Sequence, residues 1–295
     1  MSLSRLRVAL VQHSNQGDRA DNLQFIEHEI AAARDKGVKL ILLQELHNTA
    51  YFCQTEDTAA FDMAETIPGP SSRRLARMAR KHQVVIVASL FERRTAGLFH
   101  NTAVVFEADG TLAGRYRKMH IPDDPGFYEK FYFTPGDLGF APIETSVGRL
   151  GVLVCWDQWF PEAARLLTLA GAELLLYPTA IGWDMRDPDD ERERQLDAWV
   201  TIQRAHAIAN GVPVLSCNRV GFEPPPVETD PGIQFWGNSF ACGPQGEWLG
   251  RAGDDIQTLL VDVDLERAET VRRVWPFLRD RRIDAYDGLL KRFLD

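Results

Sequence analysis

The chain has 295 residues, of which 45% are hydrophobic and 25% are charged, and a formal net charge of -9. This composition is typical of a globular protein, and the acidic balance argues against nucleic acid as a partner, because phosphate binding needs a basic face. No apolar run approaches the roughly 20 residues that a membrane helix needs, and the sequence begins with an apparent strand rather than a signal peptide. We therefore expect a cytoplasmic protein without a membrane anchor.

The four cysteines, Cys53, Cys155, Cys217 and Cys242, are far apart in the sequence. No Cys-x-x-Cys pair or His/Cys cluster has the spacing of a zinc site. We therefore expect reduced thiols and predict no metal.

The first half of the chain alternates strands and helices. Apolar patterns predict strands over 7–12, 38–43, 84–90, 100–106 and 111–117. A helix capped by Asp21 is expected to end before Gly37, and a second helix is capped by Ser71 or Ser72. A hairpin turn is expected at 109–110.

The second half continues the alternation after a long loop. This loop, 119–142, is dense in aromatic residues, which argues for a functional segment rather than disorder. Strands are predicted over 143–147, 150–154, 173–177, 213–218, 239–242, 247–251 and 258–263. Helices are expected from Pro161, after the charged stretch 187–194, and in a tail, 265–295, that contacts another subunit. The pattern predicts one α/β domain, 1–295, with a mixed sheet.

Cys155 lies where the strand over 150–154 meets the helix that Pro161 opens. The unpaired N–H groups and positive dipole end of a helix favour a nearby thiolate, which is the nucleophilic form. The alternative is an ordinary buried cysteine, since free cysteine is among the most buried residue types. The Trp-Asp-Gln-Trp run at 156–159 is unusual for the end of a core strand and favours a functional site.

Glu45 and Lys118 also follow predicted strands. Ligands of open α/β sheets bind beyond the carboxyl ends of strands, so both are expected to converge with Cys155. Alone, each is most often a solvated side chain. Together, the three supply a base, a cation and a nucleophile, which acyl transfer to sulfur requires.

Three segments around these residues resemble the nitrilase, or carbon-nitrogen hydrolase, superfamily, whose members use a Glu-Lys-Cys triad in this chain order. The segments are LILLQELHNTAYFCQ, GRYRKMHIPDDPGFYEKFYFTPGD and GVLVCWDQWFPEAAR. The resemblance covers nearly the whole chain. It implies a four-layer α-β-β-α sandwich with mixed sheets, a homo-oligomer, no cofactor, and Glu129 as the family's second glutamate, which positions the catalytic groups.

Within the superfamily, AYFCQ, MHIPDDPGFYEKFYFTPGD and CWDQWFPEAAR resemble the N-carbamoylputrescine amidohydrolases. This resemblance implies hydrolysis of that carbamoyl amine, a small molecule, to putrescine, carbon dioxide and ammonia. Glu45 is the expected base, Cys155 attacks the carbamoyl carbon, and Lys118 with the Trp156 N–H group stabilises the oxyanion. A thioester intermediate follows.

An acidic or aromatic wall suits the ammonium end of this substrate. Candidates on neighbouring loops are Asp123, Asp124, Asp184, Tyr51, Phe127 and Trp183. A carbamoyl amino acid would instead need an arginine against its carboxylate, which Arg186 or Arg219 would provide. N-carbamoyl-β-alanine or N-carbamoyl amino acid amidohydrolase and omega-amidase activities therefore stay open.

Two further interpretations stand beside this one. A Cys-His hydrolase would use His47 or His120 as its base. A catalytically silent oligomeric binding protein would use no nucleophile at all, and the complete set of Glu45, Lys118, Glu129 and Cys155 argues against it.

Overall fold

A computed structural model describes residues 5–225 and 231–294. Residues 1–4, 226–230 and 295 lie outside the described ranges, so the ends of the expected domain and tail do too. Within the described chain, no helix is long and apolar enough to cross a membrane.

The first sheet brings together strands from the two ends of the chain. Its order is β15 (Gln257–Asp264), β1 (Arg5–Gln12), β2 (Leu40–Leu43), β3 (Val85–Thr95), β4 (Leu98–Phe106) and β5 (Leu112–Arg117). The central strands β1, β2 and β3 are parallel, and the outer pairings are antiparallel. The expected hairpin therefore continues a sheet whose parallel strands are buried on both faces, as their apolar sequences predict.

The second sheet repeats this pairing pattern with other strands. Its order is β14 (Trp248–Arg251), β13 (Phe240–Cys242), β10 (Val214–Asn218), β8 (Leu174–Thr179), β7 (Gly148–Val152) and β6 (Ile143–Thr145). Again the strands β7, β8 and β10 are parallel, and the outer pairings are antiparallel. A small third sheet holds β11 (Val220–Glu223), β12 (Ile233–Trp236) and β9 (Gly182–Asp184).

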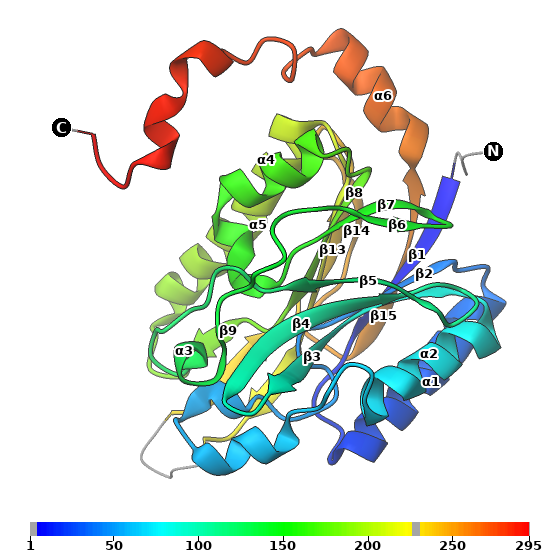
Figure 1. The fold of residues 1–295 in the computed structure, drawn as a ribbon, viewed down its shortest axis with the longest axis vertical. Helices are drawn as coiled ribbons and strands as arrows, with labels where there is room; N and C mark the ends of the chain where they lie inside the picture. The colour runs from blue at the N-terminus through cyan, green and yellow to red at the C-terminus, as the bar shows by residue number, and fades with distance from the viewer. Residues whose placement is uncertain (1–4, 226–230, 295) are drawn as a thin grey trace.

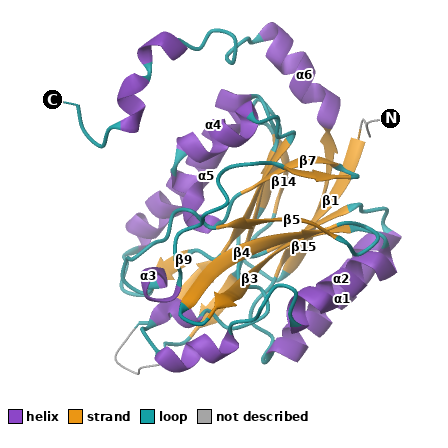
Figure 2. Ribbon diagram, in the orientation of Figure 1, coloured by secondary structure: helices purple, strands orange, loops and turns teal. Residues whose placement is uncertain are grey.

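Helices cover the outer face of each large sheet (Figures 1 and 2). They are α1 (Arg19–Asp35) and α2 (Pro70–His82) on the first sheet, and α4 (Pro161–Leu169) and α5 (Asp189–Asn210) on the second. Along β1, Val8 and Leu10 pack between the sheets, whereas Ala9 and Val11 pack against α1 and α2. This alternation confirms the four-layer α-β-β-α sandwich, because one strand supplies side chains to two cores.

Shorter elements fill the loops. They are α3 (Glu129–Tyr132), the 3-10 helices Phe52–Gln54, Thr58–Met63, Cys155–Trp159, Ile283–Ala285 and Asp287–Leu290, and the tail helix α6 (Leu265–Val274). Figure 1 shows the chain beyond α6 arching away from the sheets.

The helix starts differ from those expected. Asp18, not Asp21, caps α1, because its carboxylate accepts from the N–H groups of Ala20 and Asp21. Asp21 is the third helical residue and completes a capping box. Likewise Gly69 precedes α2, and Ser72 accepts from the Gly69 N–H at 2.7 Å. Each helix therefore begins two or three residues earlier than the sequence predicts, and the expected capping residues lie in its first turn.

Candidate active site

Glu45 lies just beyond β2, at the edge where the two large sheets meet. Its backbone N–H donates to the carbonyl of Thr179, the last residue of β8, at 3.2 Å. Its Oε1 accepts from Asn101 Nδ2 at 2.6 Å and from Lys118 Nζ at 2.8 Å. Its Oε2 is buried and has no hydrogen-bond partner among the described residues. Glu45 therefore keeps one oxygen able to accept a proton.

Lys118 follows β5 and is fully buried. Its Nζ donates to Glu45 Oε1 at 2.8 Å and to Glu129 Oε2 at 2.6 Å. Burial alone would lower the pKa of this amine, but the carboxylates of Glu129 and Glu45 outweigh it and raise the pKa well above its ordinary value. The ammonium has three donors, so one N–H is left after these two bonds.

Glu129 opens the short helix α3 and is also fully buried. Tyr51 donates its hydroxyl to Glu129 Oε1 at 2.8 Å, which leaves Oε2 for Lys118. Burial raises the pKa of Glu129 to about 7, although the ammonium of Lys118 acts in the opposite direction. Glu129 and Glu45 thus both hold the ammonium of Lys118.

Cys155 begins the 3-10 helix that follows β7, with a backbone φ of 44°. This left-handed conformation is uncommon for a residue with a side chain and often marks a functional turn. The Sγ donates weakly to the carbonyl of Ala180 at 3.8 Å. Burial, followed by the carboxylate of Glu45, raises the pKa of the thiol well above its ordinary value.

The expected stabilisation of a thiolate by the following helix is therefore wrong in direction. The five-residue 3-10 helix separates Cys155 from α4, which begins at Pro161. Desolvation disfavours the charged form of a buried thiol. At rest, Cys155 is a neutral thiol beside a carboxylate.

A cavity of about 540 Å³ opens above these residues. Glu129, Cys155 and Trp156 line it, whereas Glu45 and Lys118 have no exposed surface and lie beneath its wall. We call Glu45, Lys118, Glu129 and Cys155 the buried cluster. Further lining residues are Asp124, Phe127, Trp159, Asp184, Asp187, Glu191, Arg194, Gln195 and Trp236.

Four half-buried carboxylates of this lining, Asp124, Asp184, Asp187 and Glu191, form what we call the acidic rim. Asp184 pairs with Arg186, Glu191 pairs with Arg194, and Asp187 accepts from Gln195. Asp124 differs, since its Oδ1 is buried without a hydrogen-bond partner in the described part of the chain. Burial raises the pKa of this carboxyl group.

Several sequence candidates lie elsewhere. Tyr51 does not line the cavity but contacts two lining residues, Glu129 and Phe127. Trp183 donates its indole N–H to the carbonyl of Arg192 at 3.0 Å instead of lining the cavity. Arg219 is fully buried, paired with Glu223 and bonded to the carbonyls of Leu46 and Thr49. The guanidinium of Arg219 is therefore not offered to a substrate.

Other candidates are exposed or otherwise engaged. Asp123 is exposed and lies 4.0 Å from Lys130, and the side chain of Arg186 pairs with Asp184. His47 contacts the Ser89 carbonyl, and burial lowers its pKa to about 3. His120 donates to Asp157. The one hydrogen bond of the Cys155 Sγ in the described structure goes to a carbonyl, which leaves the Cys-His interpretation without support.

Sequence reasoning missed Glu191, Arg194 and Gln195. The charged stretch was expected to precede the last long helix, but α5 begins at Asp189 and includes most of it. Glu191 and Arg194 are three residues apart, so a helix places them on one side. That spacing is the sequence signal by which the pair could have been predicted.

Within the described residues, no group of three or more His, Cys, Asp or Glu side chains is arranged to hold a metal ion.

The fold and this site define a class of enzyme. Residues 7–273 match the carbon-nitrogen hydrolase family, and the chain belongs to it. It is a hydrolase of carbon-nitrogen bonds in linear amides.

The chain is also similar over nearly its whole length to individual members of this family. The chain is 43% identical over 288 residues to an N-carbamoylputrescine amidase of Solanum lycopersicum, covering 96% of this chain and 94% of that protein. It is 39% identical to a citrullinase of Francisella tularensis, covering 99% and 100%. A crystal structure of a carbon-nitrogen hydrolase from Helicobacter pylori G27 superposes with a TM-score of 0.96 at 53% identity, covering 98% and 100%.

Proposed function

We propose that the chain hydrolyses N-carbamoylputrescine to putrescine, carbon dioxide and ammonia through a thioester on Cys155. The observation that carries this proposal is that one cavity is lined both by Cys155 and Glu129 of the buried cluster and by the acidic rim. The buried cluster suits attack on a carbonyl carbon, and the acidic rim suits a substrate with an ammonium at its other end. The similarity to N-carbamoylputrescine amidases supports the same assignment.

The first step needs a base, because the raised pKa keeps Cys155 protonated. Glu45 takes the thiol proton on Oε2, its unpartnered oxygen, while Sγ forms a bond to the carbamoyl carbon. The carbonyl electron pair moves to oxygen. The remaining N–H of Lys118 and the backbone N–H of Trp156 stabilise this oxyanion.

Collapse of the intermediate breaks a carbon-nitrogen bond, and the departing nitrogen takes the proton from Glu45. The acyl group stays on Sγ as a thioester. Glu45 then removes a proton from water as the water attacks the thioester, and the thiol leaves with that proton. The carbamate product decomposes, so that one water and one substrate give putrescine, carbon dioxide and ammonia.

Glu129 positions Lys118 in this scheme. Its second oxygen is held by the Tyr51 hydroxyl, which limits how far the carboxylate can rotate. Tyr51 thereby acts through Glu129. Trp156 lines the cavity beside the nucleophile, whereas Trp183 supports the wall by packing on Trp236, with ring centroids 5.3 Å apart.

Asp124 is the residue we assign to the substrate's ammonium. Among the described residues, Asp124 Oδ1 is the one carboxylate oxygen of the acidic rim that is buried without a hydrogen bond. A desolvated carboxylate gains most from a cationic partner. The other three rim carboxylates already accept from neighbouring side chains.

Citrulline is the second candidate substrate, because one observation favours it. Arg194 lines the cavity and would face the carboxylate that citrulline carries and N-carbamoylputrescine lacks. Arg194 is already paired with Asp190 and Glu191, which weakens its charge toward a ligand. We therefore rank citrulline second.

A panel tests this assignment. N-carbamoylputrescine, citrulline, N-carbamoyl-β-alanine, simple amides and nitriles are assayed for released ammonia, with putrescine, ornithine and β-alanine measured by chromatography. We expect the highest kcat/KM for N-carbamoylputrescine. A higher value for any other compound would overturn the substrate assignment while leaving the nucleophile untouched.

Labelling distinguishes an enzyme from a silent binding protein. Iodoacetamide is expected to modify Cys155 first, because Cys53, Cys217 and Cys242 are buried and do not line the cavity. Peptide mapping after a short exposure gives the order of modification. A first reaction at any other cysteine would contradict the assigned nucleophile.

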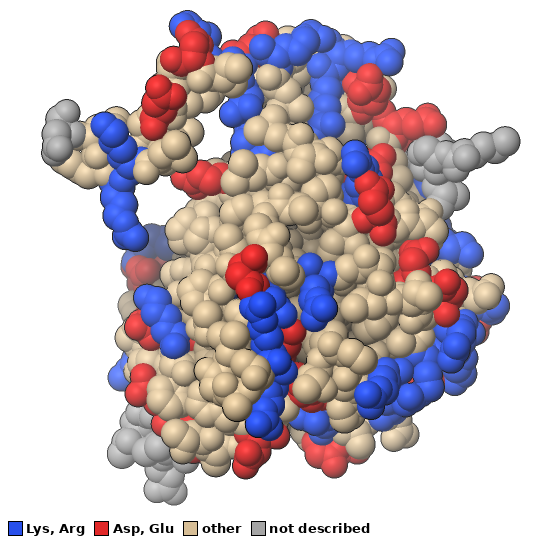
Figure 3. All heavy atoms as spheres, in the orientation of Figure 1, with Lys and Arg blue, Asp and Glu red and all other residues tan. Residues whose placement is uncertain are grey.

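We also propose a cytoplasmic homo-oligomer in which the tail covers apolar side chains of another subunit. Ile283, Leu290 and Phe293 are 71%, 94% and 80% exposed in the isolated chain, and Leu169 of α4 is 48% exposed. Figure 3 shows few charged side chains over α4 beside the arch, in contrast to the basic surface of α1 and α2. Exposed apolar groups of this extent mark an interface.

Sedimentation velocity tests the oligomer. The wild-type chain is expected to sediment as a dimer or larger, and the L290D/F293D variant as a smaller species. L138D is a matched control, since Leu138 is 44% exposed but lies outside the tail. A monomeric wild-type chain, or equal sedimentation of the wild type and the tail variant, would contradict the proposal.

A further inference from the structure

Asp157 has a fully buried carboxylate that the reaction scheme does not use. Its Oδ2 accepts from the Tyr116 hydroxyl at 2.8 Å and from the Val154 N–H at 2.9 Å. Its Oδ1 accepts from the His120 N–H at 3.0 Å and from His120 Nδ1 at 2.7 Å. Each oxygen thus accepts two hydrogen bonds, which is the full capacity of an ionised carboxylate.

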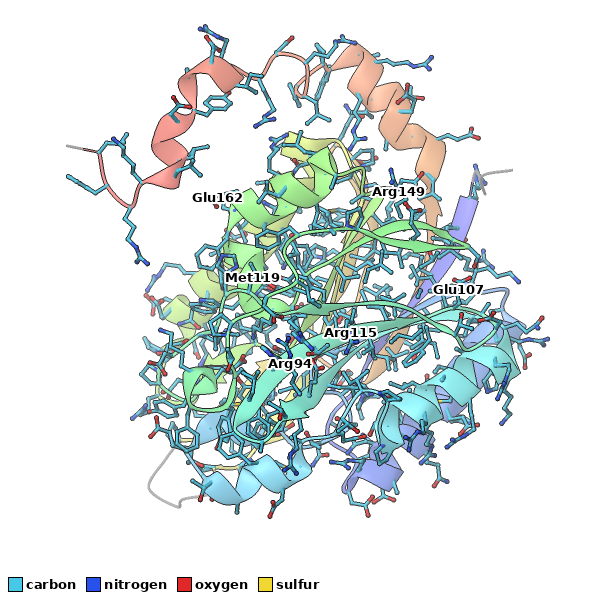
Figure 4. All side chains as sticks on the ribbon, viewed as in Figure 1. Arg94, Glu107, Arg115, Met119, Arg149 and Glu162 are labelled. Carbon is cyan, nitrogen blue, oxygen red and sulfur yellow. The ribbon has the colours of Figure 1, made fainter. Side chains whose placement is uncertain are left out.

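These donors come from the two segments that carry the nucleophile and the cation. Tyr116 and His120 stand two residues before and after Lys118, and Val154 immediately precedes Cys155. Met119, labelled in Figure 4 on the segment after β5, donates its N–H to the Tyr116 hydroxyl at 3.3 Å. One carboxylate therefore joins the Lys118 segment to the Cys155 turn.

The His120 ring is held on two sides. It stacks on Phe160 with ring centroids 3.8 Å apart and an interplanar angle of 6°. Since a carboxylate only accepts, the hydrogen must lie on Nδ1 of His120. The ring cannot rotate without losing both the stack and the hydrogen bond, so the connection between the two segments is rigid.

We propose that Asp157 is a positioning residue that sets the distance between the Lys118 ammonium and the Cys155 thiol. The inference rests on the proposed roles of these two residues but not on the identity of the substrate. A misplacement of about 1 Å at a reacting centre can cost roughly 100-fold in rate. Asp157 acts on the reaction because its bonds reach the neighbours of both reactive side chains.

The chain offers a matched carboxylate that lacks this connection. Glu65 is also buried, accepts from the Ser71 N–H at 2.7 Å and from the Ser71 hydroxyl, and lies 3.4 Å from Arg19. Arg19 and Ser71 lie at the N-terminal ends of α1 and α2, and Asn48 Nδ2, in the loop after Glu45, also donates to Glu65 at 3.5 Å. Glu65 does not line the cavity. E65Q therefore reports what the loss of a buried carboxylate does to stability alone.

The test compares D157N with E65Q. An asparagine amide places N–H donors where Asp157 accepts, so one pair of bonds is lost without a change in side-chain size. With any substrate that the wild type hydrolyses, we expect kcat of D157N to fall about 10- to 100-fold, with KM within about threefold of wild type. E65Q is expected to lower the melting temperature and to keep kcat within about twofold.

A kcat for D157N within threefold of wild type, or one reduced no more than in E65Q, overturns the inference. If D157N does not fold, Y116F replaces it in the test. Phenylalanine keeps the ring of Tyr116 and removes one of the four hydrogen bonds that the Asp157 carboxylate accepts. The kcat of Y116F is expected to fall about three- to tenfold at unchanged KM, and unaltered kcat overturns the inference equally. If the wild type hydrolyses no amide at all, the proposed function fails first, so the two failures are distinguishable.

Discussion

The buried cluster and the acidic rim hold their charges in opposite ways. The cluster is fully desolvated, and its charges are fixed by hydrogen bonds of 2.6 to 2.8 Å. The rim is half-buried, Arg186 and Arg194 pair with two of its carboxylates, and the neutral amide of Gln195 donates to a third. Charge interactions strengthen as water is excluded, so chemistry belongs at the bottom of the cavity and substrate choice at its mouth. Substitutions in the buried cluster should therefore reduce activity most, and substitutions in the acidic rim should reduce it least.

Substitution of the proposed nucleophile should cause the largest loss of kcat. C155A is expected to reduce kcat about 10,000-fold or more, as loss of a nucleophile commonly does, and C155S to do nearly the same because a serine hydroxyl is far less acidic. Ammonia release measures both. C242S is the control, since Cys242 is equally buried in β13 but remote from the cavity. Substantial turnover by C155A would place the reaction elsewhere.

Lys118 should come next. K118M keeps the length of the side chain but removes two ion pairs and the oxyanion donor, so kcat is expected to fall about 100- to 1000-fold. The melting temperature should fall as well, because Glu45 and Glu129 lose their buried counterion. A variant with normal kcat would show that the oxyanion depends on other donors.

Glu129 joins the two parts of the comparison, because it belongs to the cluster and also lines the cavity. E129Q keeps the shape and is expected to reduce kcat about 10- to 100-fold. The pKa of Glu129 is raised to about 7 from an ordinary value of 4.5. The folded state therefore retains a proton that the unfolded chain releases, and Glu129's contribution to stability falls as pH rises from 4.5 to 7.

Melting temperatures measured between pH 4.5 and 7 test the direction in which Glu129 changes stability with pH. E129Q lacks the titration, so its melting temperature should rise relative to that of wild type as pH increases. Parallel curves for the two proteins would show that Glu129 does not titrate in this window.

The rim should give the smallest effect. D124N is expected to raise KM for N-carbamoylputrescine about two- to fivefold, within the range of partly exposed ion pairs, with kcat unchanged. D123N is the control, since Asp123 is exposed beside Asp124 but does not line the cavity. The difference should shrink in high salt and be absent for an uncharged amide. Equal KM values for D124N and D123N would remove Asp124 from ammonium binding.

The sequence revealed the reactive side chains better than their surroundings. Glu45, Lys118 and Cys155 each follow a predicted strand, so the rule that ligands bind beyond strand ends predicts that they converge, and the family resemblance predicts the same set. The thiol's pKa was misjudged, because burial and the approach of Glu45 arise only when the sheets pack. Asp124 and Asp184 of the rim are sequence candidates, whereas Glu191, Arg194 and Gln195 are not predicted, because the start of α5 is charged throughout and offers no apolar stripe. The strands β9, β11 and β12 are also not predicted from the sequence, because each has only three or four residues and shows no clear alternating pattern.

The shared pairing pattern of the two large sheets has a consequence for the newly made chain. The proposed base, Glu45, follows a strand of one sheet and the proposed nucleophile, Cys155, follows a strand of the other, and the Glu45 N–H donates to the Thr179 carbonyl where the sheets meet. A partly folded intermediate with a single completed sheet therefore carries an ordinary, unassisted sulfhydryl. We therefore expect amide cleavage to begin only after both sheets have formed and packed together.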